Sequence, residues 1–171
     1  MSIEHCFVLM FTLAATELAV ADCNNAIPKT TPDNAFALHN DGTVTHNKTG
    51  LMWMRCELGQ TWDGTTCGGS GQPYSWQSAL QAAEGYAFAG YSDWRLPNKN
   101  ELASIVEQAC YYPAINTLVF TNVTSSYVWS SSPYANYSGN AWSVGSAFGD
   151  VAGYNVGDYN YNHVRLVRGG Q

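Results

Sequence analysis

The chain has 171 residues, which corresponds to one domain and is long enough to bury a hydrophobic core. Seven Lys and Arg residues stand against thirteen Asp and Glu residues, so the formal net charge is −6. This balance argues against nucleic acid and anionic lipid as partners, because both bind basic surfaces. Only 12% of the residues are charged, and uncharged polar residues are correspondingly abundant. That composition suits an extracellular β-rich protein better than a cytosolic helical one.

The N-terminus has the pattern of a secretion signal. An apolar run at 7–15 precedes Ala19-Val20-Ala21, a small-x-small cleavage sequence. We therefore expect residues 1–21 to be a Sec-type signal peptide and residues 22–171 to form a single domain that is secreted, periplasmic or on the cell surface. The apolar run is too short to span a membrane, so no direct membrane insertion is expected. The alternative is a buried N-terminal helix.

Cleavage after residue 21 would remove Cys6 and leave four cysteines, an even number that suggests two disulfides in an exported chain. Cys56 and Cys67 flank a loop containing Gly and are expected to close it. Cys23 would then tie the N-terminus to Cys110. A zinc site is the rival interpretation, but the spacing contains no C-x₂-C pair. We expect no metal and no cofactor.

The first half of the chain predicts a meander of short strands followed by helices. Residues 36–45 read as two strands around an Asp-Gly turn, and 51–56 as a third strand with an apolar face. A helix is predicted to begin after an N-cap at Ser75 and to end at Gly85. Asn98 or Asn100 is expected to cap a second helix over 101–109, and a short strand is expected at 90–97.

The sequence beyond residue 113 shows no helical periodicity and predicts strands and loops. Two helices inside a β-rich frame make an α+β protein. Trp53 and Trp129 are expected in the core, while Trp142 is less certain. Arg95 is expected to pair with a carboxylate in a structural role.

The stretch 126–163 is predicted to be the ligand-binding region. It contains six of the eleven tyrosines and five asparagines, and no Lys or Arg occurs between Lys99 and Arg165. Tyr gives rigid amphipathic contact area, and Ser, Gly and Asn give adaptable hydrogen bonds, as in binding loops. The alternative is a Gly-rich β segment with ordinary turns. The expected ligand contacts are Tyr134, Asn136, Tyr137, Asn140, Ser143, Asp150, Tyr154, Asn155, Asp158, Tyr159, Asn160, Tyr161 and His163.

Four motifs, in order, resemble a known family. They are residues 41–45 with 49–53, residues 93–102, Trp129-Ser130-Ser131-Ser132 and residues 164–168. Together they are similar to the C-terminal domain of the Legionella collagen-like adhesin and its relatives, over roughly residues 35–170. The resemblance implies a C-type-lectin-like fold: two helices, a small antiparallel sheet and a long C-terminal loop region that binds ligands.

The C-terminal layout is also similar to the variable proteins of diversity-generating retroelements. Their diversified codons are adenine-rich, so Asn, Tyr, Ser, Asp, Gly and Ala accumulate at exposed positions, and residues 134–163 have that alphabet. The collagen-like adhesin recognises sulfated glycosaminoglycans, which implies a glycosaminoglycan-binding adhesin as an alternative. The loop region lacks the Lys and Arg clusters that such a ligand requires, so a protein or a neutral glycan fits it better.

The predicted function is therefore a secreted or surface-displayed ligand-binding module of the adhesin or receptor type, with a diversified C-terminal binding surface. Its partner would be a protein or glycan on another cell or a host surface. The second hypothesis is a structural or assembly protein of the cell surface. The third is an enzyme, which we do not expect because no G-x-S-x-G, H-E-x-x-H or phosphate-loop motif occurs. The sequence leaves the oligomeric state and calcium binding open.

Overall fold

A computed structural model describes residues 21–157 and 162–169. The predicted signal peptide, apart from Ala21, lies outside these residues. Four of the predicted ligand contacts also lie outside them: Asp158, Tyr159, Asn160 and Tyr161. Within the part of the chain that is described, no helix combines the length and the apolar character needed to cross a membrane.

The secondary structure consists mainly of short strands. The strands are β1 (Asp22–Cys23), β2 (Phe36–Leu38), β3 (Thr43–His46), β4 (Leu51–Met54), β5 (Thr61–Trp62), β6 (Cys67–Gly68), β7 (Cys110–Tyr111), β8 (Tyr127–Pro133), β9 (Asn140–Gly145), β10 (Val151–Asn155), β11 (Asn162–His163) and β12 (Val167–Arg168). The helices are the 3-10 turn η1 (Asp33–Ala35), α1 (Trp76–Ala83) and α2 (Lys99–Ala103).

One four-stranded sheet has the order β12-β4-β3-β2 and contains the predicted meander. The Asp-Gly turn between β2 and β3 forms as expected: the Asp41 carboxylate accepts a hydrogen bond from the Thr43 backbone N–H at 3.0 Å, and Gly42 has a φ of 85°. Val44 and Trp53 pair across β3 and β4 and are fully buried. Trp53 therefore belongs to the core, as predicted.

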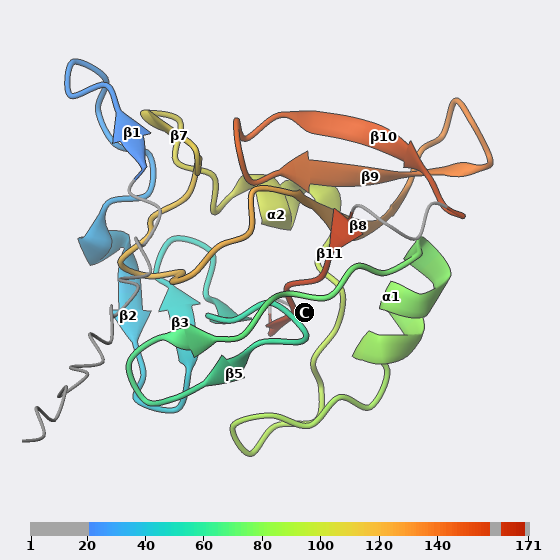
Figure 1. Cartoon of the computed structure of the whole chain (residues 1–171), viewed down its shortest axis with the longest axis horizontal. Coiled ribbons are helices and arrows are strands. Elements are labelled where there is room, and N and C mark those ends of the chain that lie inside the picture. Colours follow the sequence, from blue (N-terminus) through green and yellow to red (C-terminus); the bar gives the residue numbers. More distant parts are fainter. Residues whose placement is uncertain (1–20, 158–161, 170–171) are drawn as a thin grey trace, which may run out of the picture.

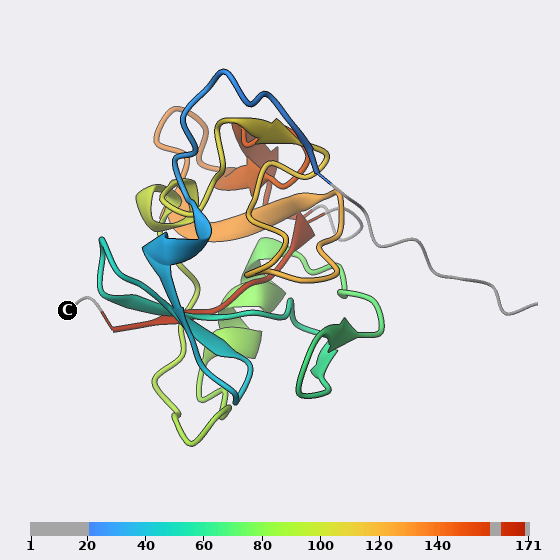
Figure 2. The same ribbon diagram turned by 90° about the vertical axis from the view of Figure 1, so that its left-hand side faces the viewer.

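A second four-stranded sheet has the order β10-β9-β8-β11 and lies on the opposite side of the molecule (Figures 1 and 2). Strands β8, β9 and β10 form an antiparallel meander, and β11 joins β8 in parallel. We refer to these three antiparallel strands as the β8–β10 sheet. The prediction of a long C-terminal loop region was wrong, because β9 and β10 form a regular hairpin inside residues 126–163.

The predicted α+β, C-type-lectin-like fold with two helices was also wrong. Strands hold 32% of the residues and helices 11%, and only one helix has seven or more residues. That helix is α1, which begins at the predicted N-cap, where the Ser75 hydroxyl accepts a hydrogen bond from the Ser78 N–H at 3.2 Å. The protein is mostly β, with several small sheets in place of a two-helix layout.

The second helix is shorter than predicted because tertiary contacts compete for its C-terminal half. Asn98 caps α2 in a capping box with Glu101, as the sequence suggests, but the helix ends at Ala103. Beyond that point Val106 bridges to Ile115 instead of continuing the helix. The Glu107 carboxylate accepts hydrogen bonds from the backbone N–H group of Ala109 and from those of Thr30 and Thr31, which lie 77 and 76 positions away in the chain.

Two disulfides fasten the periphery. Cys23 is bonded to Cys110, which joins β1 to β7, and Cys56 is bonded to Cys67, which closes the loop containing β5. These are the two pairs expected from the sequence. The first links residues that are 87 positions apart, so it removes a large amount of conformational freedom from the unfolded chain.

Candidate functional site

The surface feature that distinguishes the β8–β10 sheet is a ladder of three aromatic rings, Trp142, Tyr134 and Tyr137. The Tyr134 ring meets Trp142 edge-on with the ring centroids 4.3 Å apart. On its other side Tyr134 stacks on Tyr137, with centroids 5.7 Å apart and planes within 14°. Tyr137 ends the ladder and is 65% exposed. We call these three residues the aromatic ladder.

A glycine makes room for the middle ring of the ladder. Gly153 on β10 pairs with Trp142 on β9, and a Cβ atom at Gly153 would lie 3.0 Å from the Tyr134 ring. The Tyr134 ring can therefore lie against the strand itself. The turn that carries Tyr137 is closed by backbone hydrogen bonds, including one from the Asn140 N–H to the Tyr137 carbonyl at 3.0 Å.

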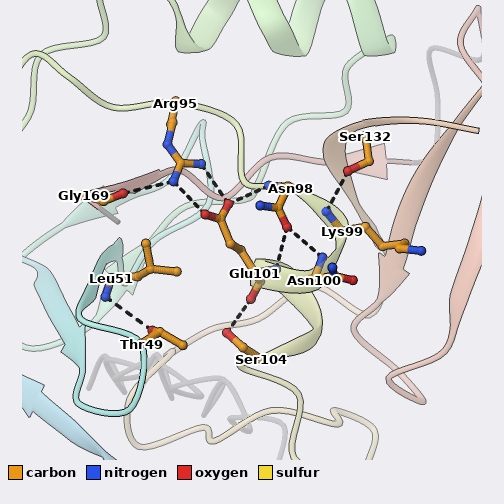
Figure 3. A network of polar contacts seen from close by, with 10 residues as sticks. All are labelled: Thr49, Leu51, Arg95, Asn98, Lys99, Asn100, Glu101, Ser104, Ser132 and Gly169. Carbon is orange, nitrogen blue, oxygen red and sulfur yellow. Dashed lines mark hydrogen bonds and ion pairs between the residues drawn. The ribbon is translucent and has the colours of Figure 1, made fainter. Parts of the chain in front are cut away.

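The base of the ladder is held by α2. The ammonium group of Lys99, the first residue of α2, lies 4.6 Å from the centre of the Trp142 ring, a cation–π contact. The Lys99 backbone N–H donates to the Ser132 hydroxyl at 3.0 Å, which attaches the start of α2 to β8 (Figure 3). The Ser131 N–H also donates to the Pro97 carbonyl at 2.7 Å.

Arg95 and Glu101 lock the start of α2 in place, as Figure 3 shows. The two side chains form a bidentate pair with N–O distances of 2.8 and 2.7 Å. Glu101 also accepts from the Asn98 N–H at 2.7 Å, and Arg95 donates to the Gly169 carbonyl. The Arg95 guanidinium is the main cause that lowers the pKa of the Glu101 carboxyl. Arg95 thus has the structural role predicted from the sequence.

The opposite side of the β8–β10 sheet faces the interior. Successive side chains of a strand point to opposite faces, so Ser143 lies on the side opposite to Trp142. There Ser143 pairs with Trp129, and both are fully buried. The Ser143 hydroxyl accepts a hydrogen bond from the buried Asn162 amide at 3.0 Å. We call this side the Trp129 face and the side with the aromatic ladder the ladder face.

A buried charge cluster lies on the side of the sheet opposite to Trp129, where His163 on β11 pairs with Val128 on β8. Glu57 is fully buried, and its carboxylate oxygens lie 2.8 Å from His163 Nδ1 and 3.4 Å from the Arg165 guanidinium. Arg165 also donates to the backbone carbonyls of Met54 and Arg55 and lies over the Phe120 ring. Burial lowers the pKa of the Arg165 guanidinium, while the Glu57 carboxylate opposes that shift. These contacts join β4 to the last strands.

Tyr127, Asp150 and Tyr154 form a further group on the Trp129 face. The Tyr127 hydroxyl donates to the Asp150 carboxylate at 2.5 Å, and the Tyr127 and Tyr154 rings are 4.5 Å apart. The hydrogen bond to Asp150 is the main cause that raises the pKa of Tyr127, and Tyr154 adds to it. Tyr154 is half-buried and packs against the hydrophobic cluster around Trp129.

The thirteen predicted contacts therefore separate into groups. The exposed ones are Asn136, Tyr137, Asp150 and Asn155, and the half-buried ones are Tyr134, Asn140 and Tyr154. Ser143 and His163 are buried, with their polar groups used inside the molecule, so we leave them out of the candidate surface. The remaining four lie outside the described residues.

The sequence reasoning missed three contributors to the site. Lys99 lies far from the Tyr-rich stretch in the chain, and no local pattern connects it to Trp142. Gly153 contributes because it has no side chain, which leaves space for the Tyr134 ring. Composition alone does not indicate this role. Trp142 itself was uncertain; it is half-buried and forms the base of the ladder.

A second exposed aromatic group lies at the other end of the β9–β10 hairpin. Phe148, in the hairpin turn, is 59% exposed, and its ring centroid is 4.7 Å from that of Tyr112. Tyr111 contacts Tyr112 in turn and donates a hydrogen bond to Asp22. We call Tyr111, Tyr112 and Phe148 the turn cluster. The sequence analysis did not single it out.

A small internal cavity and the possible metal ligands are the remaining features that bear on ligand binding. A cavity of ≈ 30 Å³ lies between α2 and the β8–β9 strands, lined mainly by apolar side chains such as Leu102, Val128 and Val144. It is far smaller than a pocket for an organic ligand. Within residues 21–157 and 162–169, no three His, Cys, Asp or Glu side chains are grouped so that they could hold a metal ion.

The fold and surface define a disulfide-bearing, mostly β domain with an exposed aromatic face. The sequence profile described as "Lcl C-terminal domain" matches residues 42–168, so the chain belongs to this family of Legionella collagen-like protein C-terminal domains. The resemblance identified from the four sequence motifs is thereby confirmed. No curated protein matches the chain significantly. Family membership indicates an adhesin-like surface module, and the two disulfides are consistent with an extracellular or surface location.

Proposed function

We propose that this domain is a surface-displayed binding module that attaches to a protein or glycan on another cell through the ladder face. One observation carries the proposal: Tyr137 is 65% exposed although its ring is held by stacking on Tyr134. An isolated exposed tyrosine samples several rotamers, and fixing it on a ligand costs entropy. A tyrosine whose ring is already stacked loses less conformational entropy when it binds a ligand.

The residues named beside Tyr137, at the outer end of the ladder, are polar and uncharged. Asn136 is exposed beside Tyr137, and Asn155 is exposed at the end of β10. Amide side chains offer both donors and acceptors, which suits a ligand rich in hydroxyl or peptide groups. The four described cysteines also support a binding role over a catalytic one. All four are in disulfides, so none of them is available as a nucleophile.

Diversification of this surface remains part of the proposal. Asn136, Tyr137 and Asn155 project from a hydrogen-bonded hairpin, and exposed positions of this kind tolerate changes of side chain at small cost to stability. Sequencing the encoding locus tests the idea. A near-copy of the DNA beside a reverse transcriptase gene supports diversification, and the absence of both contradicts it.

Cell binding by point variants tests the proposed function. The fluorescently labelled full chain is incubated with epithelial and bacterial cells, and bound protein is measured by flow cytometry. Tyr137→Ser should lose most of the binding, whereas Tyr111→Ser, the same change in the turn cluster, should bind as the unmodified protein does. Equal binding by Tyr137→Ser and the unmodified chain would contradict the proposal.

The second candidate function is self-assembly at the cell surface. The turn cluster favours it, because exposed adjoining aromatic rings are typical of protein interfaces. Light scattering of the purified chain separates the two functions. A monomer at high concentration contradicts assembly, whereas an oligomer that Phe148→Ser dissociates supports it.

A further inference from the structure

We infer that the aromatic ladder is a stacking subsite for a neutral pyranose sugar, so the ligand of the ladder face is an uncharged glycan. This inference rests on the proposed function and narrows it to one class of ligand. Three features of the described residues support it: an exposed and stacked aromatic ring, amide groups beside that ring, and no free cation there.

The first feature is the orientation of Tyr137. Its ring is stacked on Tyr134, with the two planes within 14° and the centroids 5.7 Å apart. The residue is nevertheless 65% exposed, so much of the ring remains accessible to a ligand. A flat apolar face rimmed by a hydroxyl matches a pyranose, whose axial C–H groups form an apolar patch surrounded by hydroxyls.

The second feature is the position of two asparagines. Asn140 pairs with Asn155 across β9 and β10, two residues along from the pair Trp142 and Gly153. Alternate cross-strand pairs point to the same face, so both asparagines lie on the ladder face. The Asn155 side-chain oxygen Oδ1 accepts a hydrogen bond from the Gly157 N–H at 2.8 Å. This contact fixes the amide and leaves its NH₂ group as a donor for a sugar hydroxyl.

The third feature is the local charge. The only basic side chain described at the ladder is Lys99, and its ammonium group lies 4.6 Å from the centre of the Trp142 ring at the ladder's base. No Lys or Arg occurs between Lys99 and Arg165 in the sequence, and Arg165 is buried. Sulfate or carboxylate groups on a sugar are normally bound by several Arg or Lys side chains. The site is therefore suited to an uncharged sugar.

Glycan binding by the full chain tests the inference. The probes are immobilised chitotetraose, cellotetraose, lactose and N-acetyllactosamine as neutral glycans, with heparin as the polyanion. Tyr137→Ser removes the ring, and Tyr137→Phe keeps the ring while removing the hydroxyl. We expect binding to at least one neutral glycan, weakened about thirtyfold in Tyr137→Ser, as for a binding hot spot, and largely kept in Tyr137→Phe. Saturation-transfer NMR should place the sugar C–H protons against aromatic protons.

Two variants separate stacking from a general loss of structure. Gly153→Val pushes the Tyr134 ring off the strand, so it should weaken glycan binding while Tyr137 itself is unchanged. Asn155→Ala should weaken binding without altering the ladder. Circular dichroism of each variant checks that the fold is retained. If Gly153→Val does not fold, Asn155→Ala alone is compared with the unmodified chain.

The outcomes distinguish the inference from the function on which it rests. Binding to heparin alone, or neutral-glycan binding that Tyr137→Ser leaves unchanged, overturns the inference. If no neutral glycan binds but cells are still bound in a Tyr137-dependent way, the sugar assignment fails and the adhesin function stands, with a protein as the ligand. Loss of cell binding after periodate oxidation of the cells, but not after protease treatment, supports the sugar.

Discussion

The two faces of the β8–β10 sheet are built from the same kinds of residue and serve different purposes. On the ladder face Tyr137 is exposed and stacked, and Asn155 projects beside it. On the Trp129 face Tyr154 packs against the core, and Ser143 and Asn162 bond to each other in the interior. Tyr and Asn therefore occur on both sides of one sheet.

This difference shows why composition alone does not locate a binding surface. A strand alternates its side chains between the two faces of a sheet. A stretch rich in Tyr and Asn therefore places some of these residues on each face. Polar residues that reach the interior are retained only where they find hydrogen-bond partners, as Ser143 and Asn162 do. The comparison predicts that variants on the Trp129 face affect stability and variants at the exposed end of the aromatic ladder affect binding.

The largest expected effect is on the buried charge cluster of Glu57, His163 and Arg165. Arg165→Met leaves Glu57 buried without its guanidinium partner, and we expect it to lower the free energy of unfolding by about 3–5 kcal/mol. Urea denaturation followed by fluorescence measures the change. The double variant Arg165→Met with Glu57→Gln should recover part of the loss. A loss below about 1 kcal/mol for the single variant would show that the pair does not hold the sheets together.

Tyr154→Ser should have the next largest effect. The ring packs against the Trp129 cluster and against Tyr127, so its removal should cost about 2 kcal/mol of stability. Cell binding by the fraction that stays folded should be unchanged. Thermal unfolding measures the first quantity and flow cytometry the second. A stable variant without binding would place Tyr154 on the ligand surface instead.

Tyr137→Ser makes the same change on the ladder face as Tyr154→Ser makes on the Trp129 face. Because most of the side chain is exposed, we expect the stability to change by no more than about 0.5 kcal/mol. A fall in stability as large as that of Tyr154→Ser, measured in the same denaturation experiment, would show that the ladder supports the fold and is not a presented surface.

The smallest expected effect is on the pH dependence of stability. The pKa of Tyr127 is raised in the folded protein by its hydrogen bond to Asp150, so the unfolded chain releases the Tyr127 proton first as pH rises. Stability contributed by this group is present below pH ~10 and is lost as pH rises above that value. Tyr127→Phe should make the alkaline fall in stability shallower, measured by urea denaturation between neutral and alkaline pH. An unchanged slope would contradict this role for Tyr127.

Local sequence signals predicted some parts of the fold well. The Asp41-Gly42 turn, the Ser75 and Asn98 caps and the burial of Trp53 and Trp129 depend on a few neighbouring residues, and all are present in the structure. The length of α2 was overestimated because Glu107, within the predicted helix, bonds to a distant segment. Distant partners of this kind leave no periodic signal in the chain.

The candidate site was predicted in outline and not in detail. Composition was the reason for expecting a ligand-binding region at 126–163, yet it gave no sign that β9 and β10 pair there, because their Gly and Asn residues are common in turns. Without the pairing, the faces of Ser143 and Tyr137 could not be assigned. The contact between Lys99 and Trp142 joins segments more than 40 residues apart and depends on how α2 docks on β8.

The central claim is that the ladder face binds the ligand while the Trp129 face holds the sheet in the fold. Measuring cell binding and melting temperature together for Tyr137→Ser and Tyr154→Ser tests it most directly. The account predicts that Tyr137→Ser loses binding and keeps its melting temperature, while Tyr154→Ser keeps binding and melts at a lower temperature. The reverse assignment, or loss of both properties in both variants, would contradict it.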